Sequence, residues 1–507
     1  MRVVIDGSAL TVDEVIAVAL GKAKVAVGDG LDARMEPARA LVQRVLDNDE
    51  TVYGITTGFG ALANTRVSVD QASDLQYDLL RSHASGVGDL LEPETVRAML
   101  LCRARTLSQG YSGVRPDVVR YLVAMLDNDI LPAVPCQGSV GASGDLAPFA
   151  HLALPVIGEG FVLSDDGPVP SLPVLEAHGI VPLELQPKEG LSLLNGTEGM
   201  LAHGCLAVHA ARLLVEADDA ACALSVEALM GSERPFEKRI HDLRPHPGQA
   251  RSAERIRNLL AGSEISASHR DDFTHKVQDA YSLRCAPQVH GAVRDTITYA
   301  TDVFNRELGA VVDNPIVFAE DGDVVSGGNF HGQPLAFAMD FLAIAVTELG
   351  SISERRTDRL LDPDRSSGLT PFLATTPGVS SGYMITQYTA AAIVAENKVL
   401  AHPASVESIP TSGLQEDHVS MGWGAARKLG VVLTNTARVV AVELMCASQG
   451  VEQRDLDPAP GTGRVKDVVR SVCRPLVEDR PPGVDIESIA ALITAGAFSD
   501  IEETDHE

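Results

Sequence analysis

A short glycine-rich stretch, GSVGASGDLAP at residues 138–148, contains the residue types needed to build an electrophile from the backbone itself. If the chain folds tightly there, the amide nitrogen of Gly144 can attack the carbonyl carbon of Ala142, because neither small residue blocks the approach. Loss of water from this adduct and from Ser143 would leave a five-membered ring with an exposed methylidene group. Strained backbone of this kind clusters at active sites, and Asp145 is placed to move protons. An ordinary turn is the alternative, since Gly, Ser and Asp are common turn residues.

Other chemical patterns in the chain are weak. GFGALA at 58–63 matches the G-x-G-x-x-A form of a dinucleotide loop, and Asp78 follows about 20 residues on. The downstream chain lacks the alternation of strands and helices that a Rossmann sheet requires, so a nicotinamide oxidoreductase ranks third among the functions considered. The chain has neither a G-x-S-x-G nucleophile elbow nor an H-E-x-x-H pair. We therefore predict no metal and no nucleotide cofactor.

Taken in order, the motifs of nearly the whole chain resemble those of the aromatic amino acid lyase family, and within it the members that act on histidine. The family's cofactor is 4-methylidene-imidazole-5-one (MIO), built from Ala-Ser-Gly, so the resemblance implies that Ala142, Ser143 and Gly144 form it. The motifs that carry the resemblance are YGITTGFGALA, RSHASGVG, GSVGASGDLAP, KEGLSLLNGTEGML, VQDAYSLRCAPQVHG, DNP, SGGNFHG, SERRTDRLLD and PTSGLQEDHVSMGW.

The resemblance implies the non-oxidative elimination of ammonia from L-histidine to give trans-urocanate, the first step of histidine degradation. This reaction needs help because the proton on the β carbon is barely acidic and the amine leaves poorly. An electrophile adds the substrate and stabilises the charge that develops. Alternatives are another MIO enzyme, either a Phe or Tyr ammonia-lyase or a 2,3-aminomutase, and a catalytically silent helical protein. The intact Ala142–Gly144 triad and Tyr53 argue against the silent protein.

Site residues are carried over from the family's motifs one by one. Tyr53 would be the base that takes the β proton, which demands a pKa well below the roughly 10 of free tyrosine. Nearby Arg or helix N-termini could supply that shift. Arg284 would hold the substrate carboxylate through a two-pronged hydrogen bond. The residues implied to order the ammonium end and the cofactor are Tyr281 and Asn195, and those implied to line the pocket are Gln278 and Phe330.

Three positions bear on the choice of substrate. His83, preceded by Ser82, stands where the family's phenylalanine lyases tend to have an apolar pair. His83 and Glu416 could bond the two nitrogens of an imidazole, and such a site discriminates against rings that lack them. Met384 stands where phenylalanine lyases tend to carry Lys. All three point to L-histidine. The chain departs from the family's frequent residues at Gly413-Leu414 and Cys285-Ala286.

The elements that must position these residues are mainly helices. Hydrophobic residues make up 45% of the chain and aromatic residues only 4%, which favours packed helices over a strand-rich sandwich. Long stretches without proline predict long helices that form a bundle. The first 190 residues are broken more often by Gly and Pro, and 158–171 could form a small hairpin. We predict a mainly α fold, with a loop-rich N-terminal domain bearing the MIO loop (1–190) and a long-helix bundle (191–507).

Charge and composition limit the partners. A net charge of −28 argues against nucleic acid and against an anionic membrane surface. Seven scattered cysteines without a C-x-x-C motif indicate neither disulfides nor zinc. Asp6, Asp13 and Glu14 stand where a signal peptide needs an uninterrupted apolar core. No uninterrupted apolar run approaches the roughly 18 residues of a membrane span, so we expect a cytoplasmic protein. The family implies a homotetramer with each active site assembled from three subunits.

Overall fold

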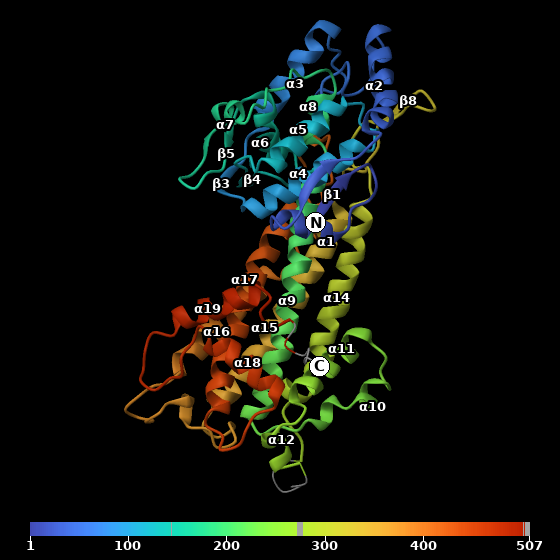
Figure 1. The fold of residues 1–507 in the computed structure, drawn as a ribbon. Coiled ribbons are helices and arrows are strands. Elements are labelled where there is room, and N and C mark those ends of the chain that lie inside the picture. Colours follow the sequence, from blue (N-terminus) through green and yellow to red (C-terminus); the bar gives the residue numbers. More distant parts are fainter. Residues whose placement is uncertain (143, 271–276, 500, 502–507) are drawn as a thin grey trace. The chain divides into compact units, whose positions relative to one another are not determined.

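The computed structural model describes residues 1–142, 144–270, 277–499 and 501, and it is mainly helical (Figure 1). These residues contain 19 α-helices and four two-stranded sheets, so the mainly α prediction is confirmed. Ser143, the central residue of the proposed electrophile, lies outside the described residues.

The chain divides into two compact units. The first consists of Met1–Leu206, Thr301–Met339 and Ala404–Arg427, and the second of Ala207–Ala300, Asp340–Pro403 and Lys428–Glu507. A single domain boundary is predicted after residue 190, whereas the two units take alternating segments of the chain. Most of their boundaries fall inside the long helices α9 (Glu198–Ala228), α14 (Ala286–Glu307), α15 (Gln333–Leu361) and α17 (Gly422–Val451).

The first unit holds most of the short helices and all eight strands of the described chain. The strands form one parallel pair, β1–β2, and three antiparallel pairs, β3–β4, β5–β6 and β7–β8. The β5–β6 pair is the hairpin predicted within 158–171. The elements are β1 (Arg2–Ile5), α1 (Val12–Ala19), β2 (Lys24–Val27), α2 (Leu31–Asp47), α3 (Val69–His83), β3 (Val87–Leu90), α4 (Pro93–Ser108), α5 (Pro116–Asp127), β4 (Pro135–Gln137), α6 (Leu146–Ala153), β5 (Phe161–Val162), β6 (Val169–Pro170), α7 (Ser171–Ala177), α8 (Glu189–Leu194), β7 (Ile316–Phe318) and β8 (Asp323–Val325).

Three helices of this unit, α3, α6 and α8, pack against one another and position the site. Each has a predicted site residue at one end: α3 ends at His83, α6 begins directly after the Ala142–Gly144 loop, and α8 is followed by Asn195. Helix α4, beside α5, is buried along almost its whole length from Thr95 to Ser108. Its first residue is proline, which suits the first turn of a helix because that amide has no intrahelical acceptor.

The second unit is built from long helices and the shorter helices around them. The helices predicted in the proline-free stretches are present as α9, α15, α16 and α17. The remaining helices are α10 (Lys238–His241), α11 (Pro247–Leu260), α12 (Glu264–Ser268), α13 (Tyr281–Arg284), α16 (Met384–Leu400), α18 (Pro460–Arg470) and α19 (Gly483–Thr494).

Three helices, α9, α15 and α17, are long and apolar enough to cross a membrane by length and composition alone. The expectation of no span-like segment was wrong, because it considered only uninterrupted apolar runs. The most apolar windows of these helices are 61%, 61% and 78% buried inside the protein. A helix that other parts of the protein cover on most sides is apolar on nearly all of its faces. Apolar composition alone therefore does not distinguish a buried core helix from a membrane-spanning one.

Candidate active site

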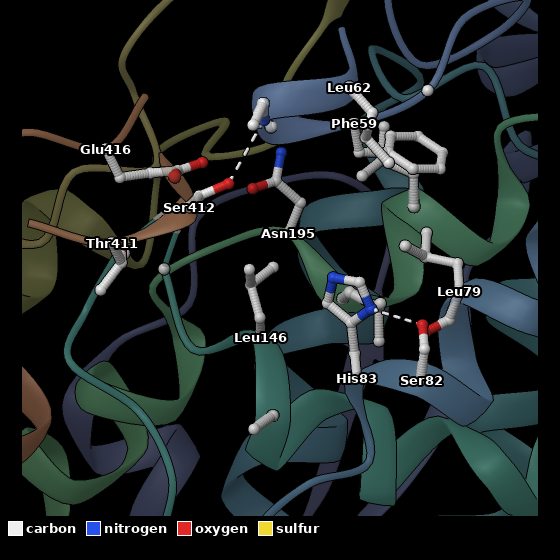
Figure 2. Close-up of a pocket in the computed structure, with 18 of the residues that line it drawn as sticks. Phe59, Leu62, Leu79, Ser82, His83, Leu146, Asn195, Thr411, Ser412 and Glu416 are labelled. Atoms are coloured by element: carbon white, nitrogen blue, oxygen red, sulfur yellow. Dashed lines mark hydrogen bonds between the residues drawn. The ribbon is translucent and has the colours of Figure 1, made fainter. Parts of the chain in front are cut away.

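A cavity of about 570 Å³ opens in the first unit where the ends of α3, α6 and α8 meet (Figure 2). Its lining includes half of the twelve residues predicted for the site, and these come from segments far apart in the sequence. They are Tyr53, His83, Ala142, Gly144, Asn195 and Glu416.

The loop that carries the predicted electrophile is tightly folded on both sides of residue 143. Gly144 has φ of 81°, and a Cβ added there would lie 1.9 Å from the carbonyl oxygen of Gly196. The same oxygen accepts a hydrogen bond from the Asp145 amide at 2.9 Å. Only glycine fits at 144, because any side chain would collide with backbone that cannot move aside. Glycine at 144 leaves its amide nitrogen unhindered by a side chain, so the residue present there fits an MIO group.

Asp145 lies directly behind this loop and is fully buried. Its carboxylate accepts hydrogen bonds from the Met200 amide at 2.8 Å and from the Ser139 hydroxyl at 3.1 Å. Burial raises the pKa of Asp145 to about 7. A carboxyl group with this pKa can both give and take a proton at neutral pH.

Two buried acceptors line the cavity without a hydrogen-bond partner among the described residues. Oδ1 of Asn195 is one, although its Nδ2 donates to the carbonyl oxygen of Asn314 at 2.9 Å. Oε2 of Glu416 is the other. In Figure 2 the side chain of Asn195 lies between those of Glu416 and His83. Because an unpaired buried acceptor costs about 1–3 kcal/mol, these two atoms mark where a ligand's donors would be bound.

His83 lies across the cavity at the end of α3. Its Nδ1 is 3.1 Å from the Ser82 hydroxyl, and burial lowers the pKa of the imidazole. The ring is therefore neutral near pH 7, with one nitrogen able to donate and one able to accept. The loop after it is held by His151, whose Nε2 accepts a hydrogen bond from the Gly86 amide at 3.0 Å.

Tyr53 points its hydroxyl toward the turn Gly60–Leu62, and the Gly60 amide donates to it at 3.4 Å. Burial raises the pKa of Tyr53, and the charge of Glu416 raises it further. The base role predicted for Tyr53 requires a lowered pKa, so the expected shift is wrong for the chain by itself. The reason is that the described residues lining the cavity include no lysine or arginine.

A turn that sequence reasoning missed closes one side of the cavity. Ser412, Gly413 and Leu414 all have positive φ, at 50°, 62° and 72°. The Ser412 hydroxyl accepts a hydrogen bond from the Ala61 amide at 3.3 Å, so this turn is tied to the loop that follows Tyr53 (Figure 2). Gly413 suits this conformation, whereas a left-handed residue such as Leu414 costs about 1–2 kcal/mol. Gly413 was the one sequence signal for this turn, because glycine adopts positive φ at little cost.

Five predicted residues do not line this cavity. Phe330 is half-buried in the turn after β8. The other four belong to the second unit, where Arg284 donates to the Asp279 carbonyl at 3.0 Å and its guanidinium lies 4.5 Å from the Tyr281 ring centroid. Tyr281 is 71% exposed. Gln278 and Arg284 line a different cavity, within the second unit, and Met384 is the first residue of α16.

Comparison with known proteins agrees with this fold. Residues 10–471 match the family described as aromatic amino acid lyase. The chain therefore belongs to the aromatic amino acid lyase family.

Particular relatives share most of the chain. It is 51% identical to a histidine ammonia-lyase of Gloeobacter violaceus, with 97% of this chain and 96% of the relative covered. It is 52% identical to a histidine ammonia-lyase of Sorangium cellulosum, with 89% of each chain covered. Among solved structures, histidine ammonia-lyase from Trypanosoma cruzi has a TM-score of 0.90 at 42% identity, covering 99% and 95%. Tyrosine aminomutase from Streptomyces globisporus has a TM-score of 0.95 at 39% identity, covering 100% of both chains.

Proposed function

We propose that this protein is a histidine ammonia-lyase that converts L-histidine to trans-urocanate and ammonia. The observation that carries the proposal is one cavity that holds the tight Ala142–Gly144 loop together with His83 and Glu416. The relatives of about 50% identity that bear this name support it. This reaction is the first step of histidine degradation.

The cofactor would be MIO formed from Ala142, Ser143 and Gly144, with Asn195 and the Gly196 carbonyl beside it. Once formed, MIO would supply the electrophile that makes the amine of the substrate a better leaving group. Asp145, with its pKa of about 7, would give and take protons at the loop.

The remaining side chains would bind and orient the substrate. The unpaired Oε2 of Glu416 would accept the N–H of an imidazole ring, and neutral His83 would bond the ring's other nitrogen. The unpaired Oδ1 of Asn195 would accept a hydrogen bond from the substrate ammonium group. These contacts would reject phenylalanine and tyrosine, whose rings would leave buried polar groups unpaired.

Tyr53 would take the β proton at its hydroxyl oxygen, and this role requires a positive charge that the described residues of the cavity lining do not supply. We propose that other copies of the chain supply this charge in a homotetramer with shared active sites. Arg284 would be one such group, and Tyr281, Gln278, Phe330 and Met384 would complete the pocket in the same way.

We also propose that the protein works in the cytoplasm. None of the seven cysteines, all of which lie within the described residues, forms a disulfide, and a reducing compartment keeps thiols in that state.

The test is ultraviolet absorbance of the purified protein given L-histidine, with L-phenylalanine and L-tyrosine in parallel and ammonia measured in each. Urocanate with histidine alone is the expected result. If cinnamate or coumarate forms instead, the protein is an ammonia-lyase, but His83 and Glu416 do not select an imidazole ring.

A second candidate is a 2,3-aminomutase, which the similarity to tyrosine aminomutase favours. Analysis of the amino acid fraction decides between them. A β-amino acid formed without net release of ammonia would establish the aminomutase.

A further inference from the structure

A fully buried arginine of α4 holds the segment that presses against the electrophile loop. Nη1 of Arg103 donates to the carbonyl oxygens of Ser192 at 3.2 Å and Asn195 at 3.0 Å. Ser192 lies in the last turn of α8, and Asn195 directly follows that helix. The side chain of Asn195 lines the cavity. Arg103 therefore fixes the backbone at the point where the chain leaves α8.

The other arm of the same guanidinium binds the first residue of α9. Nη2 of Arg103 donates to Oε2 of Glu198 at 2.7 Å, and these side chains are 0% and 2% exposed. The guanidinium also lies 4.5 Å from the ring centroid of Phe149, on helix α6. One planar, rigid group thus joins α4, α6, α8 and α9, which a lysine ammonium could not do with the same geometry.

Gly196 lies between this ion pair and the electrophile loop. A Cβ on Gly196 would lie 2.2 Å from Oε2 of Glu198 and 2.7 Å from Nη2 of Arg103. On its other side, the Gly196 carbonyl oxygen would lie 1.9 Å from a Cβ on Gly144. The ion pair therefore packs against the Gly196 backbone, and the Gly196 backbone packs against Gly144. These contacts leave no room for Gly144 to move toward the ion pair.

We propose that Arg103 and Glu198 are positioning residues for the cyclisation of residues 142–144, an inference that rests on the proposed function. In this step the Gly144 nitrogen bonds to the Ala142 carbonyl carbon. The first water takes that carbonyl's oxygen and the amide hydrogens of Ser143 and Gly144. The second takes the Ser143 hydroxyl and its Cα hydrogen. The pair holds Gly196 in place, and Gly196 holds the loop in the compact form that this attack requires.

The energetics of a buried ion pair support positioning over simple stabilisation. Removing two charges from water is costly, and well-packed apolar residues of similar volume often serve stability equally well or better. Apolar residues cannot bind the three separate acceptors that Arg103 holds, the carbonyl oxygens of Ser192 and Asn195 and Oε2 of Glu198. Misplacement of a reacting group by about 1 Å can cost on the order of a hundredfold in rate.

The experiment follows cyclisation itself by intact mass, which falls by two waters when the electrophile forms. Arg103→Lys and Glu198→Gln are compared with wild type in samples taken at intervals after protein synthesis is stopped. Arg39→Lys is the matched control, because Arg39 is a buried arginine of the same unit that bonds the carbonyls of Gly113 and Pro187. Circular dichroism of every sample reports folding.

We expect both variants to lose the two waters more slowly than wild type, by roughly tenfold to a hundredfold. Their helical signal should be intact, and Arg39→Lys should cyclise at the wild-type rate. Loss at the wild-type rate in a folded variant overturns the positioning role. If Arg103→Lys does not fold, Glu198→Gln decides, because it keeps the side-chain shape. A wild-type chain that never loses two waters overturns the proposed function as well, so the two failures are distinguishable.

Discussion

At the scale of single residues, the cavity combines unpaired acceptors with a neutral imidazole. Oδ1 of Asn195 and Oε2 of Glu416 have no partner among the described residues, and burial keeps His83 neutral. Such a site binds a ligand that brings its own N–H donors. An ammonium group and an imidazole ring are both of that kind.

Replacing Tyr53 by phenylalanine separates cofactor formation from turnover. Tyr53→Phe should still lose two waters, since the Tyr53 hydroxyl has no part in the cyclisation. Its kcat should fall about a thousandfold, the size of a general-base contribution. Intact mass and a urocanate assay on one sample measure both. Near-normal turnover would remove Tyr53 from the base role.

Replacing Glu416 by glutamine tests the imidazole contact. Gln keeps the size of the side chain but removes its charge, so the bond to the ring N–H weakens. We expect kcat/KM for L-histidine to fall roughly a hundredfold, as for loss of a charged hydrogen bond. Glu407→Gln is the control, because it makes the same change at an exposed glutamate nine residues earlier in the same segment. An unchanged kcat/KM in Glu416→Gln would contradict the contact.

At the scale of elements, the long helices of the second unit carry a buried network of charges. His290 on α14 is fully buried, 2.9 Å from Asp218 and 2.6 Å from Asp219 on α9. Arg356 on α15 binds Asp218 and Glu443 of α17 in the same interior. This network ties four helices to one another through groups that can titrate.

The network makes stability depend on pH. Burial alone would lower the pKa of His290, but Asp218 and Asp219 outweigh it and raise the pKa to about 9. The pKa of His290 is 6.5 in the unfolded chain and about 9 in the folded protein. Between pH 6.5 and pH 9 the folded state therefore binds more protons than the unfolded state. The stabilisation is therefore complete below pH 6.5 and is lost as pH rises through 9, by on the order of 3 kcal/mol.

Urea unfolding at several pH values measures this loss, and His290→Gln should flatten it across that window. His178→Gln, at an exposed histidine, is the control. Equal pH slopes in wild type and His290→Gln would show that His290 does not link folding to protons.

At the scale of the whole molecule, the predicted site residues are divided between the two units. Among the described residues, the lining of the first unit's cavity includes Tyr53 but no lysine or arginine, while Arg284 belongs to the second unit. The proposed tetramer resolves this if each site takes residues from several copies.

Mixing two inactive variants tests shared sites. Tyr53→Phe and Arg284→Met should each be nearly inactive alone. Refolded together in equal amounts, they should regain roughly a quarter of wild-type activity, because half of the sites carry Tyr53 and half of those carry Arg284. Each variant refolded alone is the control. A mixture as inactive as its components would mean that Tyr53 and Arg284 do not meet across copies.

The sequence by itself determined the chemistry that depends on adjacent residues. Ala142, Ser143 and Gly144 must be neighbours in the chain to form a ring, so their order is readable without a fold. Helices were equally readable, because apolar spacing and the lack of proline act locally. The resemblance to the family added the pairing of His83 with Glu416.

Only the tertiary structure decided which distant groups meet. Three contacts of the site join positions that no local sequence pattern links. They are the contact of Gly196 with Gly144, the ion pair of Arg103 with Glu198, and the hydrogen bond of Ser412 with Ala61. The raised pKa of Tyr53 also needed the fold, since it follows from burial and from Glu416, more than 300 residues away in the sequence. Electrostatics and packing act through space, and sequence order does not record those distances.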